Sequence, residues 1–226
     1  WRALRRRNAR IDKVACVLQD PRPFRHFDSD EFFESLQDEY PPLRPYGYDP
    51  HSTWSRASER ANSILSIPEL RGPGRNVLEV AAGDGMTGRL LSDYGHAVVL
   101  CDVDDWRDNR ARHLAFRSAD VCQGVPFDDG SFDFIYSYNA FEHLSDPRAA
   151  LREMERACRV EGLILLSFGP LYCSAWGLHA YRALRMPYPQ FLFSRPFVDE
   201  KIAKLGIHDL GRTLYSLQPL NEWRVA

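Results

Sequence analysis

The chain has 226 residues, of which 44% are hydrophobic and 27% charged, and its formal net charge is −2 at pH 7. This length suffices for one domain with a sizeable core, and the balanced charge gives no electrostatic reason to expect a nucleic acid as substrate. No apolar run approaches the ~20 residues of a membrane span, the start does not resemble a signal peptide, and the scattered cysteines are typical of a reducing compartment. We therefore expect a cytoplasmic protein.

The region before the first predicted strand divides into a loop and a helix. Residues 41–50 combine prolines with tyrosines and are typical of a surface loop. Ser55 is then predicted to cap a helix, because its hydroxyl can accept from free backbone N–H groups. The apolar face of this helix contains Ala57, Ala61, Ile64 and Leu65. We interpret residues 1–70 as an N-terminal helical segment and residues 71–226 as the main domain.

The stretch from Asn76 to Gly88 is the most informative part of the chain. An apolar run that carries one carboxylate, Glu79, leads into a turn with Gly83 and Gly85, and a helix-like stretch follows. A strand, a loop and a helix in this order present backbone N–H groups and a helix N-terminus to a ligand. Glycine leaves room for close approach and permits backbone angles that a Cβ would penalise. We therefore expect a ligand at this turn.

Further apolar runs predict the other strands of a sheet, at residues 97–101, 113–117, 132–138 and 163–168. Before the last of these, Asp146 can cap a helix that has Pro147 at its first position. The apolar face of this helix is formed by Leu151, Met154 and Cys158. Alternating strands and helices predict an α/β fold: a Rossmann-like, doubly wound, mainly parallel sheet with helices on both faces.

Polar side chains follow the ends of several predicted strands. They are Glu79, Asp102, Asp120 and Asn139. Ligands of such sheets bind beyond the carboxyl ends of the strands, so we expect these side chains to face one site. Asp102, roughly 20 residues beyond the glycine turn, is placed to accept hydrogen bonds from ribose hydroxyls.

Two cofactors compete for this pattern. The spacing of Gly83, Gly85 and Gly88 satisfies the dinucleotide fingerprint and keeps an NAD-dependent oxidoreductase as an alternative. A dinucleotide has no evident use for Glu79 at the end of the first strand, whereas a cofactor with an amino-acid ammonium group has one. S-Adenosylmethionine, with S-adenosylhomocysteine as its product, is therefore the favoured cofactor.

Residues 76–168 resemble the class I S-adenosylmethionine-dependent methyltransferases, most closely the group that acts on small molecules and sugars. The matching segments are Val77–Gly85, Val98–Asp102, Ala119–Asp133 and Tyr138–Leu144. Two departures are that Ala81 stands where the family often has glycine, and that Glu161–Leu163 stand where a Pro-Gly-Gly turn is common. The family usually adds an antiparallel hairpin after strand five; residues 210–217, or sequence beyond this chain, could supply it.

The resemblance assigns parts of the cofactor to individual residues. Those implied to line the methionine part are Glu79, Ala81 and Gly83. Asp102 is implied to hold the ribose, and Asp120 with the Val121 amide to contact the adenine. The other residues that we assign to the cofactor site are Asp84, Gly85, Val103 and Asn139. No metal ligands are predicted.

Chemistry is expected next to the fourth strand. An oxygen acceptor must lose a proton, and His143 is the candidate base because histidine titrates near neutral pH. Glu142 can orient His143 or share in the proton transfer. A structural role for this pair is the alternative, because members of the resembled family with different acceptors also carry it.

The insert after strand five, residues 169–193, mixes aromatic faces with hydrogen-bonding groups. The candidates for acceptor binding in it are Tyr172, Trp176, His179 and Tyr181. They suit a sugar ring or a polar aromatic acceptor, and burial within a helical insert is the alternative. The resemblance also implies a lid before the first strand, with the candidates Tyr46, Tyr48, Trp54 and Arg56; packing at the edge of the core is the alternative.

The expected function is S-adenosylmethionine-dependent methyl transfer to a hydroxyl oxygen of a small molecule or a glycan, with no nucleic acid as partner. A non-catalytic cofactor-binding domain of a larger protein stays open beside the oxidoreductase. The sequence leaves open the identity of the acceptor, any dependence on metal and the oligomeric state.

Overall fold

The computed structural model describes residues 25–41, 47–170, 174–178, 180 and 184–204. The chain divides into two compact units: a sheet unit, residues 46–168, and a helical unit, residues 1–45 together with 169–226. The boundary expected at residue 70, between an N-terminal segment and the main domain, remains a prediction. Within the described ranges, no helix has both the length and the apolar character that crossing a bilayer requires.

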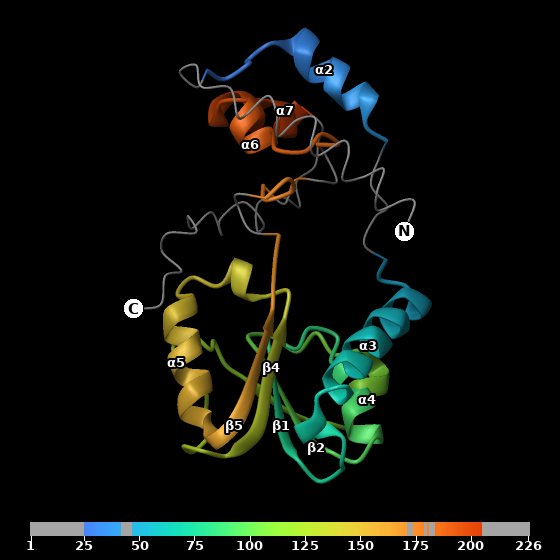
Figure 1. Ribbon diagram of the computed structural model, residues 1–226, viewed down its shortest axis with the longest axis vertical. Helices are drawn as coiled ribbons and strands as arrows, with labels where there is room; N and C mark the ends of the chain where they lie inside the picture. Colours follow the sequence, from blue (N-terminus) through green and yellow to red (C-terminus); the bar gives the residue numbers. More distant parts are fainter. Residues whose placement is uncertain (1–24, 42–46, 171–173, 179, 181–183, 205–226) are drawn as a thin grey trace. The chain divides into compact units, whose positions relative to one another are not determined.

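The sheet unit contains one sheet of five parallel strands. The strands are β1 (Asn76–Val80), β2 (Ala97–Asp102), β3 (Ala115–Ser118), β4 (Phe132–Tyr138) and β5 (Cys158–Ser167). Their order across the sheet is β3-β2-β1-β4-β5 (Figure 1). The direction in which the chain adds strands reverses at β1, and doubly wound sheets bind ligands at such a reversal. The predicted α/β fold is confirmed.

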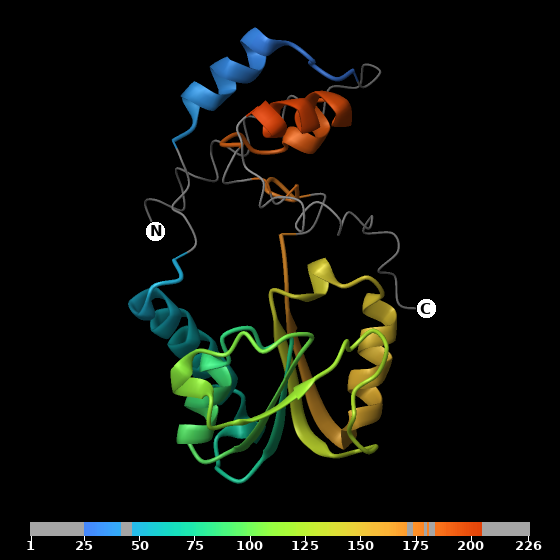
Figure 2. The same cartoon turned by 180° about the vertical axis from the view of Figure 1, so that it is seen from behind.

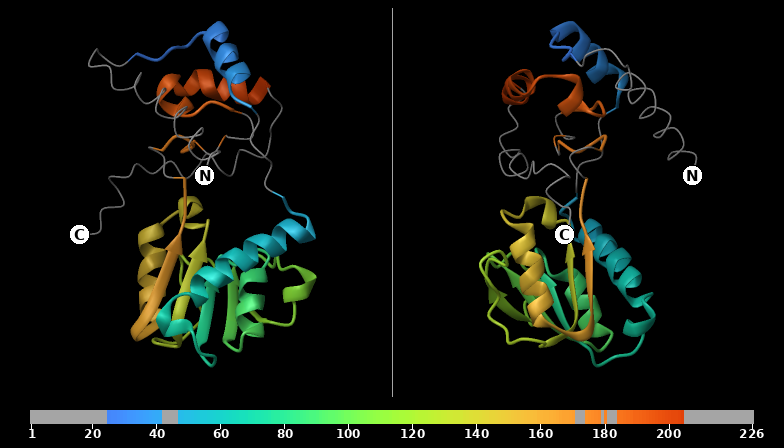
Figure 3. Two further views of the ribbon diagram at one scale, coloured as in Figure 1. Left: turned by 45° about the vertical axis from the view of Figure 1, so that its right-hand side comes forward. Right: turned by 60° about the vertical axis from the view of Figure 1, so that its left-hand side comes forward.

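Helices cover both faces of this sheet. α3 (Pro50–Leu65) and α4 (Met86–Asp93) lie on one face and α5 (Pro147–Ala157) on the other, as opposite views show (Figures 1 and 2). Figure 3 shows the same three layers from two further directions. Short 3₁₀ helices complete the unit: η1 (Pro68–Leu70), η2 (Asn109–Ala111) and η3 (Phe141–His143).

α3 begins earlier than the sequence predicts. Oδ1 of Asp49 accepts from the backbone N–H groups of His51 (3.1 Å) and Ser52 (3.0 Å). Pro50 follows at the first helical position, where its fixed φ favours the helix. Ser55, the predicted cap, lies inside the helix, so that prediction is wrong. The predicted apolar face is confirmed for the buried residues Ala57, Ala61 and Ile64.

α5 begins as predicted. Oδ1 of Asp146 accepts from the backbone N–H of Ala149 at 2.9 Å, and Pro147 is the first helical residue. The helix ends at Ala157, so Cys158 does not lie on its apolar face as predicted but opens β5. The residues that α5 buries are Pro147, Ala150, Met154 and Ala157, and of the predicted face only Met154 is among them.

β5 is irregular near its start. Its pairing with β4 shifts register between Phe132 and Phe134, and Glu161 has a positive φ of 64°. A Cβ on Gly162 would lie 2.5 Å from Sγ of Cys158, so a glycine is needed there. This segment is the one where the sequence departs from the Pro-Gly-Gly turn of the resembled family.

The core of the sheet unit lies partly between the sheet and α3. Aromatic side chains form a row along this face of β4: the rings of Phe134 and Tyr136 stack at 5.5 Å, and those of Tyr136 and Tyr138 meet edge to face at 6.1 Å. Ala61 and Ile64 of α3 belong to the same apolar cluster. This contact fixes α3 beside the carboxyl end of β4.

The helical unit contains α2 (Asp30–Glu39), α6 (Pro189–Leu192) and α7 (Arg195–Lys204). Phe33 of α2 meets Phe193 and Phe197, which come from the other end of the chain, at ring distances of 5.5 and 5.9 Å. Nζ of the buried Lys201 lies 2.9 Å from Oδ1 of Asp30. The possible strand at residues 210–217 lies outside the described residues.

Candidate active site

The loop between β1 and α4 adopts left-handed backbone angles at three positions. Ala81, Gly83 and Gly85 have φ values of 54°, 54° and 67°. The conformation of Ala81 explains why a glycine suits this position in the resembled family. A Cβ on Gly83 would meet no other atom within 4 Å, so the space in front of this backbone is open. A ligand can therefore approach the loop closely here.

Glu79 turns into the core beneath this loop. Its side chain is buried, and Oε2 accepts from the backbone N–H of Gly88 in α4 at 3.0 Å. Burial raises the pKa of Glu79 to about 8, although the Tyr136 hydroxyl and the Gly88 amide oppose this shift. The carboxyl group is therefore mostly protonated at pH 7. Through its hydrogen bond with the Gly88 amide, Glu79 holds the start of α4 against β1.

Asp102 at the end of β2 is less buried. Its Oδ2 accepts from the backbone N–H of Gly83 at 2.8 Å, and Oδ1 accepts from that of Val103 at 2.7 Å. Burial raises its pKa, and these two amides oppose the shift. The first contact joins the end of β2 to the glycine loop, so a ligand held by Asp102 also reaches that loop.

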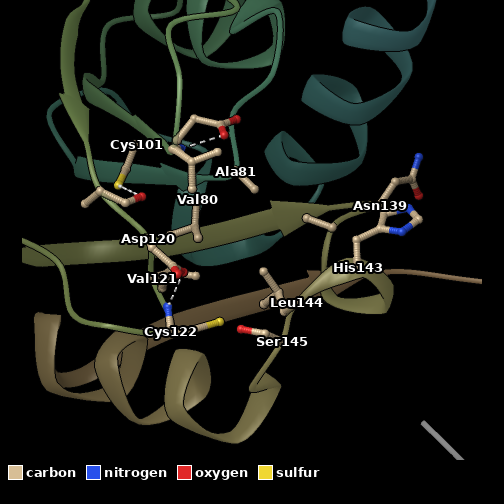
Figure 4. A pocket seen from close by; sticks show the side chains of 14 residues that line it. Val80, Ala81, Cys101, Asp120, Val121, Cys122, Asn139, His143, Leu144 and Ser145 are labelled. Carbon is tan, nitrogen blue, oxygen red and sulfur yellow. Dashed lines mark hydrogen bonds between the residues drawn. The ribbon is translucent and has the colours of Figure 1, made fainter. Parts of the chain in front are cut away.

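A cavity of about 410 Å³ opens beyond the carboxyl ends of β1, β2 and β4. The predicted site residues that line it are Ala81, Asp102, Val103, Asp120, Val121, Asn139 and His143. In Figure 4, Asp120 and Cys122 lie on one side of the view, and Asn139 and His143 on the other. This volume is within the usual range for small-molecule sites.

Other predicted site residues do not line this cavity. They are Glu79, Gly83, Asp84, Gly85 and Glu142. Other residues that line the cavity were not predicted from the sequence: Val80, Cys101, Ala119, Cys122, Ala140, Leu144 and Ser145. The missed residues are chain neighbours of predicted ones, so strand ends and their flanking residues carried the signal.

One side of the cavity is shaped by a turn after β3. Oδ1 of Asp120 accepts from the backbone N–H of Cys122 at 2.9 Å, and the carbonyl of Asp120 accepts from Gln123 (2.9 Å) and Gly124 (3.1 Å). Val121 in this turn is buried. The turn therefore presents an apolar side chain and a fixed carboxylate to the cavity.

His143 lies at the other side, in η3. Its side chain is 36% exposed, and Nε2 lies 4.0 Å from Oε1 of the buried Glu142. Asn139 precedes it with φ 52°, and its backbone N–H donates to the Ser167 carbonyl at 2.7 Å. His143 therefore borders both the cavity and the Glu142 carboxyl group.

The predicted lid and acceptor residues are placed only in part. Tyr46, Tyr172, His179 and Tyr181 lie outside the described residues. Trp176 belongs to the helical unit, whereas all the residues that line the cavity belong to the sheet unit. Tyr48 and Trp54 are 76% and 44% exposed. Arg56 donates to the Gly47 carbonyl, and its Nη2 lies 4.0 Å from Oδ2 of Asp84 in the glycine loop.

The residues present fit S-adenosylmethionine. The open space at Gly83, the half-buried carboxylate of Asp102 and the apolar turn at Val121 match a ligand with an amino-acid chain, a ribose and an adenine. Within the described ranges, no group of three or more His, Cys, Asp or Glu side chains could hold a metal ion.

Residues 78–166 match the family model described as "Methyltransferase domain". Together with the parallel sheet and the glycine loop, this match defines the sheet unit as a class I S-adenosylmethionine-dependent methyltransferase domain. The match supports S-adenosylmethionine over NAD as the cofactor of this domain.

Curated relatives of the chain are methyltransferases with different acceptors in their names. It is 33% identical over 94 residues to the mouse (Mus musculus) 18S rRNA (guanine-N(7))-methyltransferase, covering 40% of this chain and 33% of that protein. It is 28% identical over 174 residues to the demethylmenaquinone methyltransferase of Corynebacterium efficiens, covering 70% and 68%. The chain spans about a third to two fifths of the length of the mouse protein and of other curated methyltransferases that it matches.

Among solved structures, the chain is similar to an S-adenosylmethionine-dependent methyltransferase from Mesorhizobium loti, with 22% identity, a TM-score of 0.40, and coverage of 48% of this chain and 55% of that one.

Proposed function

We propose that this protein transfers a methyl group from S-adenosylmethionine to a hydroxyl oxygen of a small molecule or a glycan. The observation that carries the proposal is one cavity lined both by Asp102, the candidate ribose ligand, and by His143, the candidate base. When bound, S-adenosylmethionine supplies an electrophilic methyl group on a sulfonium sulfur.

The cofactor roles follow the lining of the cavity. Asp102 accepts from the ribose hydroxyls, which add to its contact with the Gly83 amide. Asp120 and Val121 hold the adenine at the turn after β3. Glu79, together with Ala81 and the glycine loop, supports the amino-acid part. Since Glu79 is buried beneath the loop and hydrogen-bonded to the Gly88 amide, this support acts through the position of α4.

His143 accepts the proton of the acceptor hydroxyl as the oxygen attacks. The nearby Glu142 carboxyl lies 4.0 Å from Nε2 and favours the protonated imidazole that results. Asn139 beside it helps to position the acceptor oxygen. Positioning contributes much of the rate in such a displacement, because the oxygen, methyl carbon and sulfur must lie in line.

The acceptor is proposed to bind the aromatic insert that follows β5, through Tyr172, Trp176, His179 and Tyr181. Flat rings with polar edges suit a sugar or a polar aromatic compound. Relatives are named for rRNA guanine, quinone and amino-acid acceptors. The net charge of −2 therefore does not by itself decide against RNA, and the acceptor needs a direct test.

Calorimetric titration with S-adenosylhomocysteine and, in parallel, NAD tests the cofactor. Binding of S-adenosylhomocysteine alone is expected; binding of NAD alone would refute the proposal. Mass spectrometry then screens sugars, phenols, quinones and RNA fragments for a gain of one methyl group. Transfer only to nitrogen or carbon would refute the hydroxyl acceptor and leave methyl transfer standing.

The base is tested with the acceptor that this screen identifies. His143→Ala is expected to lower turnover by about 100-fold while the affinity for S-adenosylhomocysteine is unchanged. His113→Ala, at an exposed histidine outside the cavity, is the control. Normal turnover of His143→Ala would reduce His143 to a structural residue.

A further inference from the structure

α5 carries an ion pair, Glu153 and Arg156, that does not belong to the lining of the cavity. Nη2 of Arg156 lies 2.9 Å from Oε2 of Glu153, and Nη1 lies 2.7 Å from Oδ1 of Asp129. The Arg156 guanidinium and then the Val125 amide lower the pKa of Glu153, so both members of the pair are charged at pH 7. The pair therefore needs an explanation apart from direct contact with a ligand.

The pair binds the backbone of the loop that joins β3 to β4. Oε2 of Glu153 accepts from the Val125 N–H at 3.2 Å, and Nη2 of Arg156 donates to the Val125 carbonyl at 3.1 Å. One ion pair thus holds both backbone polar groups of Val125. Nη1 of Arg156 also donates to the Phe127 carbonyl at 2.8 Å, and the Arg156 carbonyl accepts from the Gly130 N–H at 2.9 Å. This part of the loop belongs to no helix or strand, so contacts with α5 determine its path.

The residue that the pair holds directly follows the turn after β3. Asp120 and Val121 of this turn line the cavity, and its last residue, Gly124, precedes Val125. Gly124 has a φ of 124°, and a Cβ there would lie 3.7 Å from Oε2 of Glu153. The Val125 side chain is buried. Because Val125 is held by its side chain and by both backbone polar groups, it gives the turn a fixed end.

α5 is also joined to a second part of the lining. Leu144 and Ser145 line the cavity (Figure 4) and directly precede Asp146, the N-cap of α5. One helix therefore connects to two segments of the lining, at its cap and at the Glu153–Arg156 pair. Because a hydrogen-bonded helix keeps its length, α5 can hold these two segments in a constant relation.

We propose that Glu153 and Arg156 position the turn after β3 for recognition of the purine base, so that this pair controls how well adenine is distinguished from other bases. The Asp120 carboxylate accepts from the 6-amino group of adenine only when the turn places it at hydrogen-bonding distance and angle. The inference rests on the proposed function for the identity of the ligand. Its own content is the control of base recognition by two positioning residues that touch no ligand.

The test compares two ligands that differ only at the base. They are S-adenosylhomocysteine and its analogue in which a hydrogen atom replaces the 6-amino group of the purine. Calorimetry of the unmodified protein is expected to show a preference of about 10-fold or more for S-adenosylhomocysteine. Arg156→Met is expected to reduce this preference to about 3-fold or less, because the turn loses its fixed end. A change that only lowers overall stability affects both ligands alike and leaves the preference as it was. Arg156→Lys, which keeps the charge without the planar fork, is expected to recover part of the preference.

Arg152→Met is the matched control, because Arg152 is an exposed arginine of the same helix. It is expected to keep the full preference. The inference is overturned if Arg156→Met keeps the preference, or if it weakens both ligands by the same factor. Equal binding of the two ligands by the unmodified protein would also overturn it, and would leave methyl transfer standing. If Arg156→Met does not fold, as judged by thermal unfolding, Glu153→Gln and Arg156→Lys are judged with the same two ligands by the same criteria. If the unmodified protein binds neither ligand, the proposed function itself fails.

Discussion

The ends of β1 and β2 carry the same functional group in different surroundings. Glu79 is 4% exposed and turns beneath the glycine loop to the Gly88 amide, whereas Asp102 lines the cavity and meets the amides of Gly83 and Val103. Two carboxyl groups on neighbouring parallel strands can therefore act differently: the first supports the loop from within, and the second is available to a ligand. Burial rather than residue type separates the two roles.

The largest effect is expected from Glu79→Ala. It removes a buried acceptor, leaves the Gly88 N–H without its partner and opens a small cavity, which together cost about 3 kcal/mol of unfolding free energy. Urea denaturation measures this loss. Glu155→Ala, at an exposed glutamate of α5, is expected to change stability by less than about 0.5 kcal/mol. Equal stability of the two variants would show that the buried Glu79 carboxyl does not support the loop, and its contrast with Asp102 would then fail.

The pH dependence of stability is expected to come partly from Glu79. Its pKa is raised from 4.5 to about 8 on folding, so the folded protein holds a proton that the unfolded chain releases. The stability that this group contributes is therefore fully present below about pH 4.5 and is lost as pH rises toward about 8. Relative to Glu79→Gln, the unmodified protein should lose at least about 1 kcal/mol between about pH 5 and pH 8. Parallel curves for the two proteins in urea titrations would contradict this.

Asp102→Ala is expected to act on binding more than on folding. Loss of a carboxylate hydrogen-bond partner should weaken S-adenosylhomocysteine by about 1–3 kcal/mol, measured by calorimetry. The loss of unfolding free energy should be smaller than that of Glu79→Ala, because Asp102 is only partly buried. Asp104→Ala, at an exposed neighbour, serves as control. Unchanged affinity would place the ribose elsewhere.

The smallest effect is expected in the loop between β1 and α4. Ala81 has a φ of 54°, which costs an alanine more than a glycine. Ala81→Gly is therefore expected to raise the unfolding free energy by about 1 kcal/mol in urea denaturation. Ala82→Gly next to it should lower stability instead, since Ala82 is buried and has no positive φ. A loss of stability in both variants would show that the angle at Ala81 carries no strain.

The sheet was predictable because its strands follow local patterns. The apolar runs that end at Asp102 and Tyr138 became β2 and β4 with the expected ends, and Asp146 with Pro147 started α5 as expected. Elsewhere, local signals competed. Both Asp49 and Ser55 can cap a helix, and the adjacent proline favoured Asp49. Cys158 fits a helical spacing, yet its backbone pairs with β4.

The site was predictable where a polar residue directly follows a strand. Asp102 and Asn139 line the cavity for this reason. Burial depth was not predictable: Glu79 has the same place at its strand end, but the depth at which α4 packs on β1 decides where its carboxyl group points. The contact of Arg60 with the Tyr138 ring was not predictable either, because it joins residues that lie far apart in the sequence.

The core of the helical unit comes from both ends of the chain. Phe33 precedes the sheet unit in the sequence, and its partners Phe193 and Phe197 follow it. In topological terms the methyltransferase domain is an insertion within a helical host. Shortening the protein from its N-terminus would remove α2 and expose the aromatic rings that α6 and α7 place against it, which favours aggregation. A polypeptide of residues 46–168, by contrast, would retain every residue that lines the cavity.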